Sequence, residues 1–291
     1  MEKFARPKSP SRKRWSIGLS IAVIIVIIIV IVVPLAVLLP ERGHKGQKSA
    51  VILPLYIYPS NSSSWDPLYE ALDAHPELHF LVVINPSNGP GNNPLPDDNY
   101  SAQILKLNNY TNVETVGYVR TGYATQNITN VAEEVATYAG WDTQNNSLAM
   151  HGIFFDEAPH EYSADAVSYM QIVNQVVKNS TLQGAKTVIH NPGVIPDSRF
   201  DDSTTDITVI FEESYPVYQT KVTALTDLNK KNRTEYAYMV NSIPTQSLNA
   251  LRSYVDTLSE HAAYLFVTNN NQNFYDSFGS MWSDFTAVIP T

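Results

Sequence analysis

The sequence predicts an α/β fold, a closed (β/α)8 barrel of the TIM type. Eight apolar runs of strand length alternate with helical patterns, and successive runs end 22 to 37 residues apart, the length of one βα unit. The runs are apolar on both faces, as strands of a closed parallel barrel are. An open doubly wound sheet often carries a glycine-rich phosphate loop after its first strand, but residues 58–64 contain no Gly. The predicted strands are residues 51–58, 79–85, 113–120, 150–157, 187–191, 207–213, 235–241 and 264–269.

Helical periodicity supports the alternation between these runs. In three intervals, apolar residues recur at spacings of three and four, which places them on one face of a helix. These faces are Ile128, Val131, Val135 and Tyr138; Ala166, Met170, Val173 and Val177; and Leu248, Leu251, Val255 and Leu258. The interval 192–206 is short and rich in Pro and Asp. We therefore expect one βα unit without a good helix.

The N-terminal segment predicts a membrane anchor that precedes the barrel. Residues 17–39 form an uncharged apolar run long enough to span a bilayer. A cleaved signal peptide is the alternative, but the run ends without a small-residue cleavage site. Six basic residues precede the span and three follow it closely, so the positive-inside rule predicts a type II protein. The expected division is a cytoplasmic tail 1–16, an anchor 17–39, a linker 40–50 and an extracellular barrel 51–291.

Seven N-glycosylation sequons agree with this orientation, because all of them follow the span. Their acceptor residues are Asn61, Asn99, Asn109, Asn127, Asn145, Asn179 and Asn232.

Composition excludes several classes of function. The chain has no Cys, so thiol catalysis and Cys-ligated zinc are excluded. Residues 49–291 carry 10 basic and 26 acidic side chains, a formal charge of −16, which repels nucleic acid. His75 and His79 have a spacing used for metal ligation, but Pro76 interrupts the helix that would align them. We expect no metal and no cofactor.

Two predicted strands end in adjacent carboxylates. Residues 152–157 run into Asp156 and Glu157, and residues 207–213 run into Glu212 and Glu213. Unpaired carboxylates are costly to bury, and barrel active sites form at the C-terminal strand ends. Two such ends predict carboxylates that face each other across a cleft, as in glycoside hydrolysis. Because Ala158–Pro159 ends the strand, Asp156 and Glu157 can both approach the cleft.

The strand ends resemble the spherulin-4-type cell-surface proteins of fungi, including glycoside hydrolases that act on galactosaminogalactan. The resemblance covers roughly residues 50–290. Its motifs are Pro54-Leu-Tyr-Ile-Tyr-Pro59, Ile84-Asn-Pro-Ser-Asn-Gly-Pro-Gly91, Gly117-Tyr-Val119, Gly152-Ile-Phe-Phe-Asp-Glu157, His190-Asn-Pro-Gly193 and Val209-Ile-Phe-Glu212. It implies a (β/α)8 fold and an endo-α-1,4-N-acetylgalactosaminidase with Asp156, Glu157 and Glu212 as its functional acids.

Other polar and aromatic side chains at the strand ends are candidates for binding sugar. They are Tyr56, Asn85, Tyr118, Arg120, His190, Asn191, Tyr215 and Asn241. We expect Glu212 and either Asp156 or Glu157 to be the working couple, with the third acid tuning charge, while the proton donor and the stereochemical outcome stay open. Core or rim packing is the alternative role for several of the binding candidates, His190 among them.

The predicted partners are an amino-sugar polymer, the membrane and, as a candidate, the exopolysaccharide synthesis machinery. The alternatives are an endo-α-1,4-galactosaminidase of deacetylated polymer and a non-catalytic sugar-binding protein of the cell wall.

Overall fold

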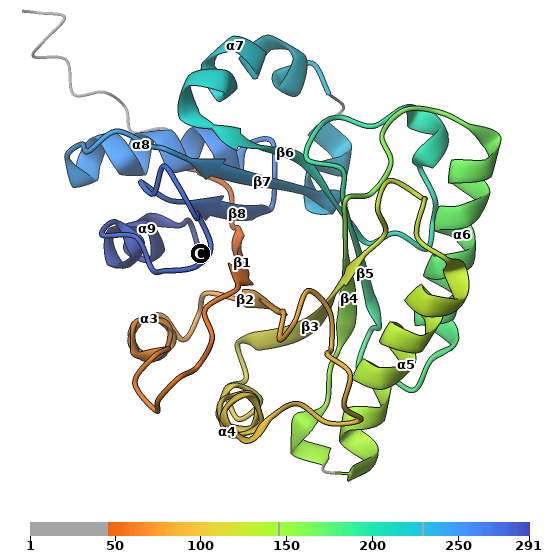
Figure 1. The fold of residues 1–291 in the computed structure, drawn as a ribbon. Coiled ribbons are helices and arrows are strands. Elements are labelled where there is room, and N and C mark those ends of the chain that lie inside the picture. The colour runs from red at the N-terminus through yellow and green to blue at the C-terminus, as the bar shows by residue number, and fades with distance from the viewer. Residues whose placement is uncertain (1–45, 145, 229) are drawn as a thin grey trace, which may run out of the picture. The chain divides into compact units, whose positions relative to one another are not determined.

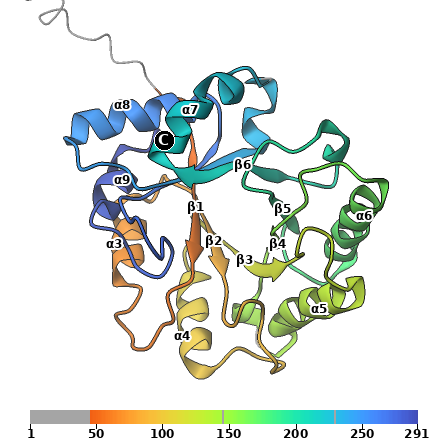
Figure 2. The ribbon, with the colours of Figure 1, turned by 45° about the horizontal axis from the view of Figure 1, so that its top comes forward.

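Eight parallel strands close into a barrel in the computed structural model, which describes residues 46–144, 146–228 and 230–291 (Figures 1 and 2). Each strand pairs with the next along the chain, and β1 closes the ring on β8 through Ala50–Tyr264 and Val51–Leu265. The predicted fold class of the barrel is therefore confirmed. The strands are β1 (Ala50–Leu55), β2 (Phe80–Ile84), β3 (Val113–Arg120), β4 (Gly152–Asp156), β5 (Thr187–Asn191), β6 (Ile207–Ser214), β7 (Tyr236–Asn241) and β8 (Tyr264–Val267).

Helices surround the strands (Figure 2). The α-helices are α3 (Asp66–Ala74), α4 (Asp98–Leu107), α5 (Ile128–Gln144), α6 (Ala164–Asn179), α7 (Tyr215–Thr226), α8 (Leu248–Ser259) and α9 (Trp282–Val288). Short 3-10 helices are η2 (Asn146–Leu148), η3 (Ser198–Phe200) and η4 (Lys230–Glu235). As predicted, the connection after β5 contains no α-helix.

Apolar side chains fill both faces of the barrel wall. On β4, Phe154 stacks against Tyr118 of β3, with ring centroids 6.4 Å apart, whereas Phe155 meets His190 of β5 at 6.2 Å. Gly152 begins β4 where the neighbouring backbone is very close, since an added Cβ would lie 2.3 Å from the Thr187 carbonyl oxygen. Burying a side chain such as Phe154 stabilises the fold by about 1.5–3 kcal/mol.

The element boundaries correct the sequence prediction in two places. β1 ends at Leu55 rather than at residue 58, and the Ile57 carbonyl accepts a hydrogen bond from the Trp65 indole at 2.9 Å instead of a strand partner. Leu248, predicted on the buried face of α8, is 42% exposed because it is the first residue of the helix, directly after the Ser247 cap.

The segment that leads into β1 is attached to the barrel. Arg233 donates to the Lys48 carbonyl at 2.7 Å and to Ser49 Oγ at 2.8 Å. Residues 48 and 49, expected in the linker, therefore contact the barrel. The predicted tail, span and the first part of the linker lie outside the described residues, and no helix within the described ranges is long and apolar enough to cross a membrane.

Candidate active site

Asp156 is the last residue of β4 and has two side-chain hydrogen-bond donors. Its Oδ2 accepts from the Tyr118 hydroxyl at 2.7 Å, and its Oδ1 accepts from Asn191 Nδ2 at 2.8 Å. Tyr118 lies on β3 and Asn191 ends β5, so the two strands flanking β4 fix this carboxylate from both sides.

Glu157 follows Asp156 in a left-handed backbone conformation, with φ of 49°. This conformation ends β4, and the Glu157 carbonyl accepts hydrogen bonds from Tyr123 N at 2.6 Å and Thr121 Oγ1 at 2.8 Å. The side chain forms an ion pair with Arg120, whose Nη2 lies 2.7 Å from Glu157 Oε2. The adjacent carboxylates can both lie at the rim because the backbone turns between them.

Asn191 connects Asp156 to Glu212. Its Nδ2, which contacts Asp156, also donates to Glu212 Oε2 at 2.5 Å. The two carboxylate oxygens can therefore be no further apart than 2.8 plus 2.5 Å. Retaining glycosidases have carboxyl groups about 5–5.5 Å apart, whereas inverting enzymes need about 6.5–9.5 Å. The two oxygens bridged by Asn191 are compatible with the shorter spacing.

Burial raises the pKa of Glu212 above its ordinary value. Hydrogen bonds from Tyr275 and Asn191 lower it, but the neighbouring charges of Asp156 and Glu213 raise it, and the net shift is upward. A carboxyl group whose pKa is raised beside an ionised carboxylate is suited to donating a proton. Glu213 is exposed, and its Oε2 accepts only from Ser214 within the described residues.

Three tyrosines form an aromatic wall beside the carboxylates. Tyr56 contacts Tyr118 and Tyr275 edge to face, with ring centroids 5.6 and 5.4 Å apart. The Tyr275 hydroxyl donates to Glu212 Oε1. Burial, followed by the charges of Asp156 and Glu212, raises the pKa of Tyr56 well above its ordinary value, so it stays a neutral phenol. Such a wall offers apolar faces and hydroxyl groups to a sugar ring.

The sequence reasoning missed Tyr275. It lies in the loop after β8, 63 residues from Glu212. The available signal was the aromatic segment Phe274-Tyr-Asp-Ser-Phe278, which begins shortly after the last predicted strand, 264–269.

Several predicted binding residues are not brought to the carboxylates. His190 turns to the outer face of the barrel, where its Nε2 lies 2.7 Å from Asn174 Oδ1 of α6. Tyr215 packs edge to face on Tyr254 of α8, with centroids 5.4 Å apart.

Two predicted amides contact their own loops. Asn85 Oδ1 accepts from Gly89 N at 3.0 Å, and buried Asn241 accepts from Ser242 Oγ at 2.8 Å. Their contacts with substrate stay predictions. No three His, Asp or Glu side chains of the described residues are grouped as metal ligands.

Comparisons with known proteins agree with this geometry. The sequence model of spherulation-specific family 4 matches residues 50–289. Spherulin-4 of Physarum polycephalum is 33% identical over 164 residues, which are 56% of this chain but only 45% of that protein. The crystal structure of Aspergillus clavatus Sph3 in complex with GalNAc is 40% identical, with a TM-score of 0.80 over 84% of this chain and 99% of that one. The chain therefore belongs to spherulation-specific family 4, as its strand-end motifs predicted, and its domain is a (β/α)8 barrel.

Proposed function

We propose that the chain hydrolyses α-1,4-linked N-acetylgalactosamine inside a fungal exopolysaccharide of the galactosaminogalactan type. The observation that carries this proposal is the connection of Asp156 to Glu212 through one amide, Asn191, beside an aromatic wall. The amino sugar is suggested by the GalNAc bound to the Aspergillus protein.

The roles of the acids follow from their contacts. Glu212, whose pKa is raised, donates its proton to the glycosidic oxygen as the leaving chain departs. Asp156, held by two hydrogen-bond donors, attacks the anomeric carbon and forms a glycosyl–enzyme intermediate. Glu212 then accepts a proton from water, which attacks the same carbon and releases Asp156. The product keeps the anomeric configuration of the substrate.

Glu157 is proposed to tune the charge of the site. Its ion pair with Arg120 partly neutralises one of three clustered acids, which limits the repulsion felt by Asp156. Arg120 is held by this contact and would face substrate at the edge of the cleft.

Digestion of defined chains tests the activity. The full-length protein is incubated with fully acetylated and fully deacetylated α-1,4-linked galactosamine oligosaccharides, and the products are identified by mass and by the anomeric signals of the first product. We expect shorter acetylated oligosaccharides of retained configuration. Cleavage confined to deacetylated chains would favour the galactosaminidase alternative, and binding of both chains without cleavage would favour the sugar-binding cell-wall protein.

We further propose a type II membrane protein whose barrel lies outside the cell, supported by residues 17–39 and the basic residues before them. Five of the sequon residues are exposed on the barrel, namely Asn61, Asn99, Asn109, Asn127 and Asn179. In sealed microsomes, the barrel should resist external protease and lose mass on glycosidase treatment. Digestion from the cytosolic side would contradict this topology.

A further inference from the structure

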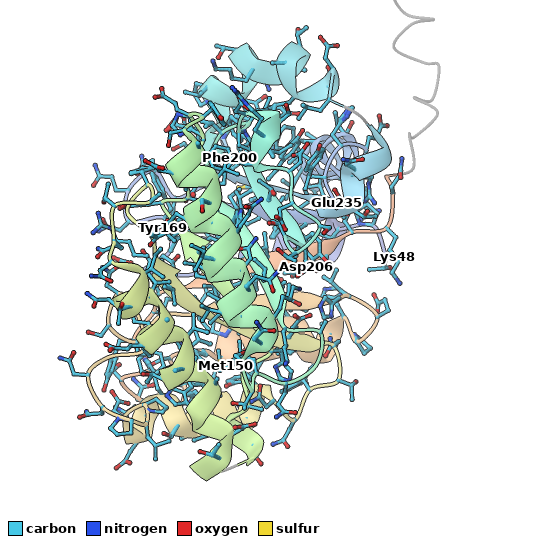
Figure 3. All side chains as sticks on the ribbon, turned by 90° about the vertical axis from the view of Figure 1, so that its right-hand side faces the viewer. Lys48, Met150, Tyr169, Phe200, Asp206 and Glu235 are labelled. Atoms are coloured by element: carbon cyan, nitrogen blue, oxygen red, sulfur yellow. The ribbon has the colours of Figure 1, made fainter. Side chains whose placement is uncertain are left out.

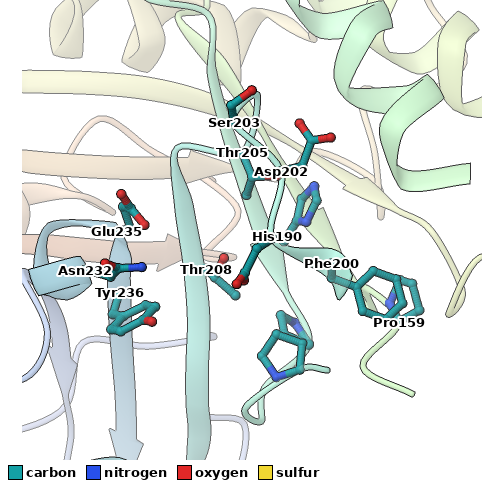
Figure 4. A pocket seen from close by; sticks show the side chains of 13 residues that line it. Pro159, His190, Phe200, Asp202, Ser203, Thr205, Thr208, Asn232, Glu235 and Tyr236 are labelled. Atoms are coloured by element: carbon teal, nitrogen blue, oxygen red, sulfur yellow. The ribbon is translucent and has the colours of Figure 1, made fainter. Parts of the chain in front are cut away.

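A second cavity lies on the outer wall of the barrel, where the connection after β5 lacks an α-helix. Its volume is about 460 Å³, within the range of about 300–1,000 Å³ typical of small-molecule sites. Figure 4 shows Tyr236 and Glu235 on one wall, His190 and Asp202 on the other, and Thr208 of β6 between them. We call it the outer-wall pocket. Asp156, Glu157 and Glu212 do not line it.

The position of this pocket follows from the fold. α-Helices cover other parts of the barrel wall, as α6 does in Figure 3. The same view labels Phe200 and Glu235, which line the outer-wall pocket. After β5 the chain forms only η3 and an extended loop, and η4 precedes β7. Thr208 of β6 therefore lines a cavity, and His190 of β5, which is hydrogen-bonded to Asn174 of α6, also lines it.

His190 presents a hydrogen-bond acceptor at this pocket. It is 5% exposed and lines the cavity. Asn174 Nδ2 donates to the hydroxyls of Thr204 and Thr205, so Asn174 Oδ1 is free to accept from His190 Nε2. Burial lowers the pKa of His190 to about 4, so the ring is neutral and Nδ1 keeps its lone pair. With Nε2 as the donor, Nδ1 is the acceptor atom of the ring.

The lining is anionic and rich in acceptors. Asp201, Asp202 and Glu235 contribute carboxylates, and no Lys or Arg is among the described side chains that line the pocket. Burial raises the pKa of Asp202, but hydrogen bonds from Thr204 outweigh that effect and hold it below its ordinary value. Asp202 is therefore ionised at neutral pH. Two cations of this region have partners of their own, since Arg199 pairs with Asp197 at 2.7 Å and Lys178 pairs with Asp206 at 2.6 Å.

We propose that the outer-wall pocket is a second carbohydrate site, which binds one hexosamine unit that carries a free, protonated amine. Carboxylates match the ammonium group, His190 Nδ1 and the Thr208 hydroxyl accept from sugar hydroxyls, and Tyr236 and Phe200 offer aromatic surfaces to the ring. The inference extends the proposed function, because an amino-sugar polymer would occupy both sites. Deacetylated units would be held on the wall while acetylated units are cleaved at the rim.

Glu235→Gln tests the proposal in the full-length protein with hydrolysis disabled by Asp156→Asn. Glu235 is exposed, so this change leaves the fold intact. Galactosamine, N-acetylgalactosamine and galacturonate are titrated by NMR. We expect Glu235→Gln to weaken galactosamine binding about tenfold, the size of one charge-assisted hydrogen bond, and to leave N-acetylgalactosamine binding unchanged. Galacturonate should not bind in the pocket.

Glu133→Gln is the matched control, since Glu133 is an exposed acid on α5 outside the pocket. Equal galactosamine affinity in the two variants would overturn the proposal. So would binding that appears only after Asn232→Gln, because Asn232 also lines the pocket and its own glycan would then be the occupant. If the protein with Asp156 restored cleaves no polymer but galactosamine binding still depends on Glu235, the pocket stands and the proposed hydrolysis fails.

Discussion

Two glutamates at opposite ends of the barrel have similar hydrogen-bond contacts, but their pKa values are shifted in opposite directions. Glu114, near the start of β3, accepts a hydrogen bond from Thr187 at 2.5 Å and lies 3.7 Å from His79. Glu212, near the end of β6, accepts hydrogen bonds from Asn191 and Tyr275. Burial raises the pKa of both carboxyl groups. The net pKa of Glu114 is nevertheless lowered, whereas that of Glu212 is raised.

Burial is the largest effect on the pKa of both carboxyl groups, hydrogen bonds come next, and the neighbouring charges then act in opposite directions. Glu114 faces His79 and His151, which favour its ionised form, whereas Glu212 faces Asp156 and Glu213, which disfavour it. The first arrangement stabilises the native fold. The surroundings of Glu212 cost some electrostatic stability and favour a protonated carboxyl group at the C-terminal rim, the end of the barrel where active sites form.

The largest expected effect is a loss of hydrolytic activity when the acids at the C-terminal end of the barrel are changed. Glu212→Gln should lower hydrolysis of the acetylated oligosaccharide about 10²–10⁴-fold, the range of one general acid–base group. Asp156→Asn, which removes the proposed nucleophile, should lower it at least as much. Each melting temperature should stay close to that of the unaltered protein. Glu157→Gln should also lower turnover, because Arg120 loses its charged partner. Glu213→Gln is the control, and an essential Glu213 with a dispensable Glu212 would refute the assignment.

A change of Glu114, at the opposite end of the barrel, should alter the stability of the protein but not its activity. Glu114→Gln should lower the free energy of unfolding at pH 7 by about 1 kcal/mol, because it removes charge-assisted contacts with Thr187 and His79. The folded-state pKa of Glu114 lies below its unfolded value, so its contribution is present above the unfolded pKa and is lost as the pH falls through the folded pKa. Urea unfolding at pH 7 and pH 3 should therefore show a smaller difference at pH 3. A loss of hydrolysis in this variant would contradict the expectation that Glu114 affects stability and not activity.

Tyr275→Phe sharpens the assignment of Glu212 as the proton donor. The Tyr275 hydroxyl lowers the pKa of Glu212, so its removal should raise that pKa further. More of the protonated acid then persists at high pH, and the alkaline limb of the kcat/KM profile should move to higher pH, with a loss of a few-fold at the optimum. Tyr58→Phe, at an exposed tyrosine bonded to Asp97, should leave the profile unchanged. An alkaline limb that stays in place or moves to lower pH would argue against Glu212 as the acid.

A third glutamate provides the smallest effect. Burial raises the pKa of Glu134 on α5 to about 7, and its Oε2 has no hydrogen-bond partner among the described residues. The folded state holds this proton more tightly than the unfolded chain, so stability is present below the unfolded pKa of about 4.3 and is lost as the pH rises through about 7. Glu134→Gln should therefore raise the melting temperature at pH 8 more than at pH 4. Equal shifts at both pH values would exclude this cause.

Much of the barrel could be predicted because strand burial and helix periodicity are local patterns. The β5 connection without an α-helix was also visible, since residues 192–206 are too short and polar for one. The adjacent acids Asp156 and Glu157 were placed correctly at the end of β4 because Ala158–Pro159 indicates that the strand ends there.

The finer geometry of the site could not be predicted from local sequence patterns. Alternation along β6 could not decide between Glu212 and Glu213, because the pairing register of β6 with β7 shifts between Val209 and Phe211. His190 and Asn191 are neighbours with opposite directions, and only the contacts show that Asn191 faces the acids. Tyr275 reaches Glu212 through a loop whose path no local pattern specifies.

The attachment of residues 47–49 has a consequence for where the chain enters and leaves the barrel. Ser49 N donates to the Pro290 carbonyl at 2.8 Å, so the first and last described segments meet at the end of the barrel where β1 begins. The carboxylates lie at the other end, where the strands finish. The chain therefore enters and leaves the barrel at the end opposite the carboxylates.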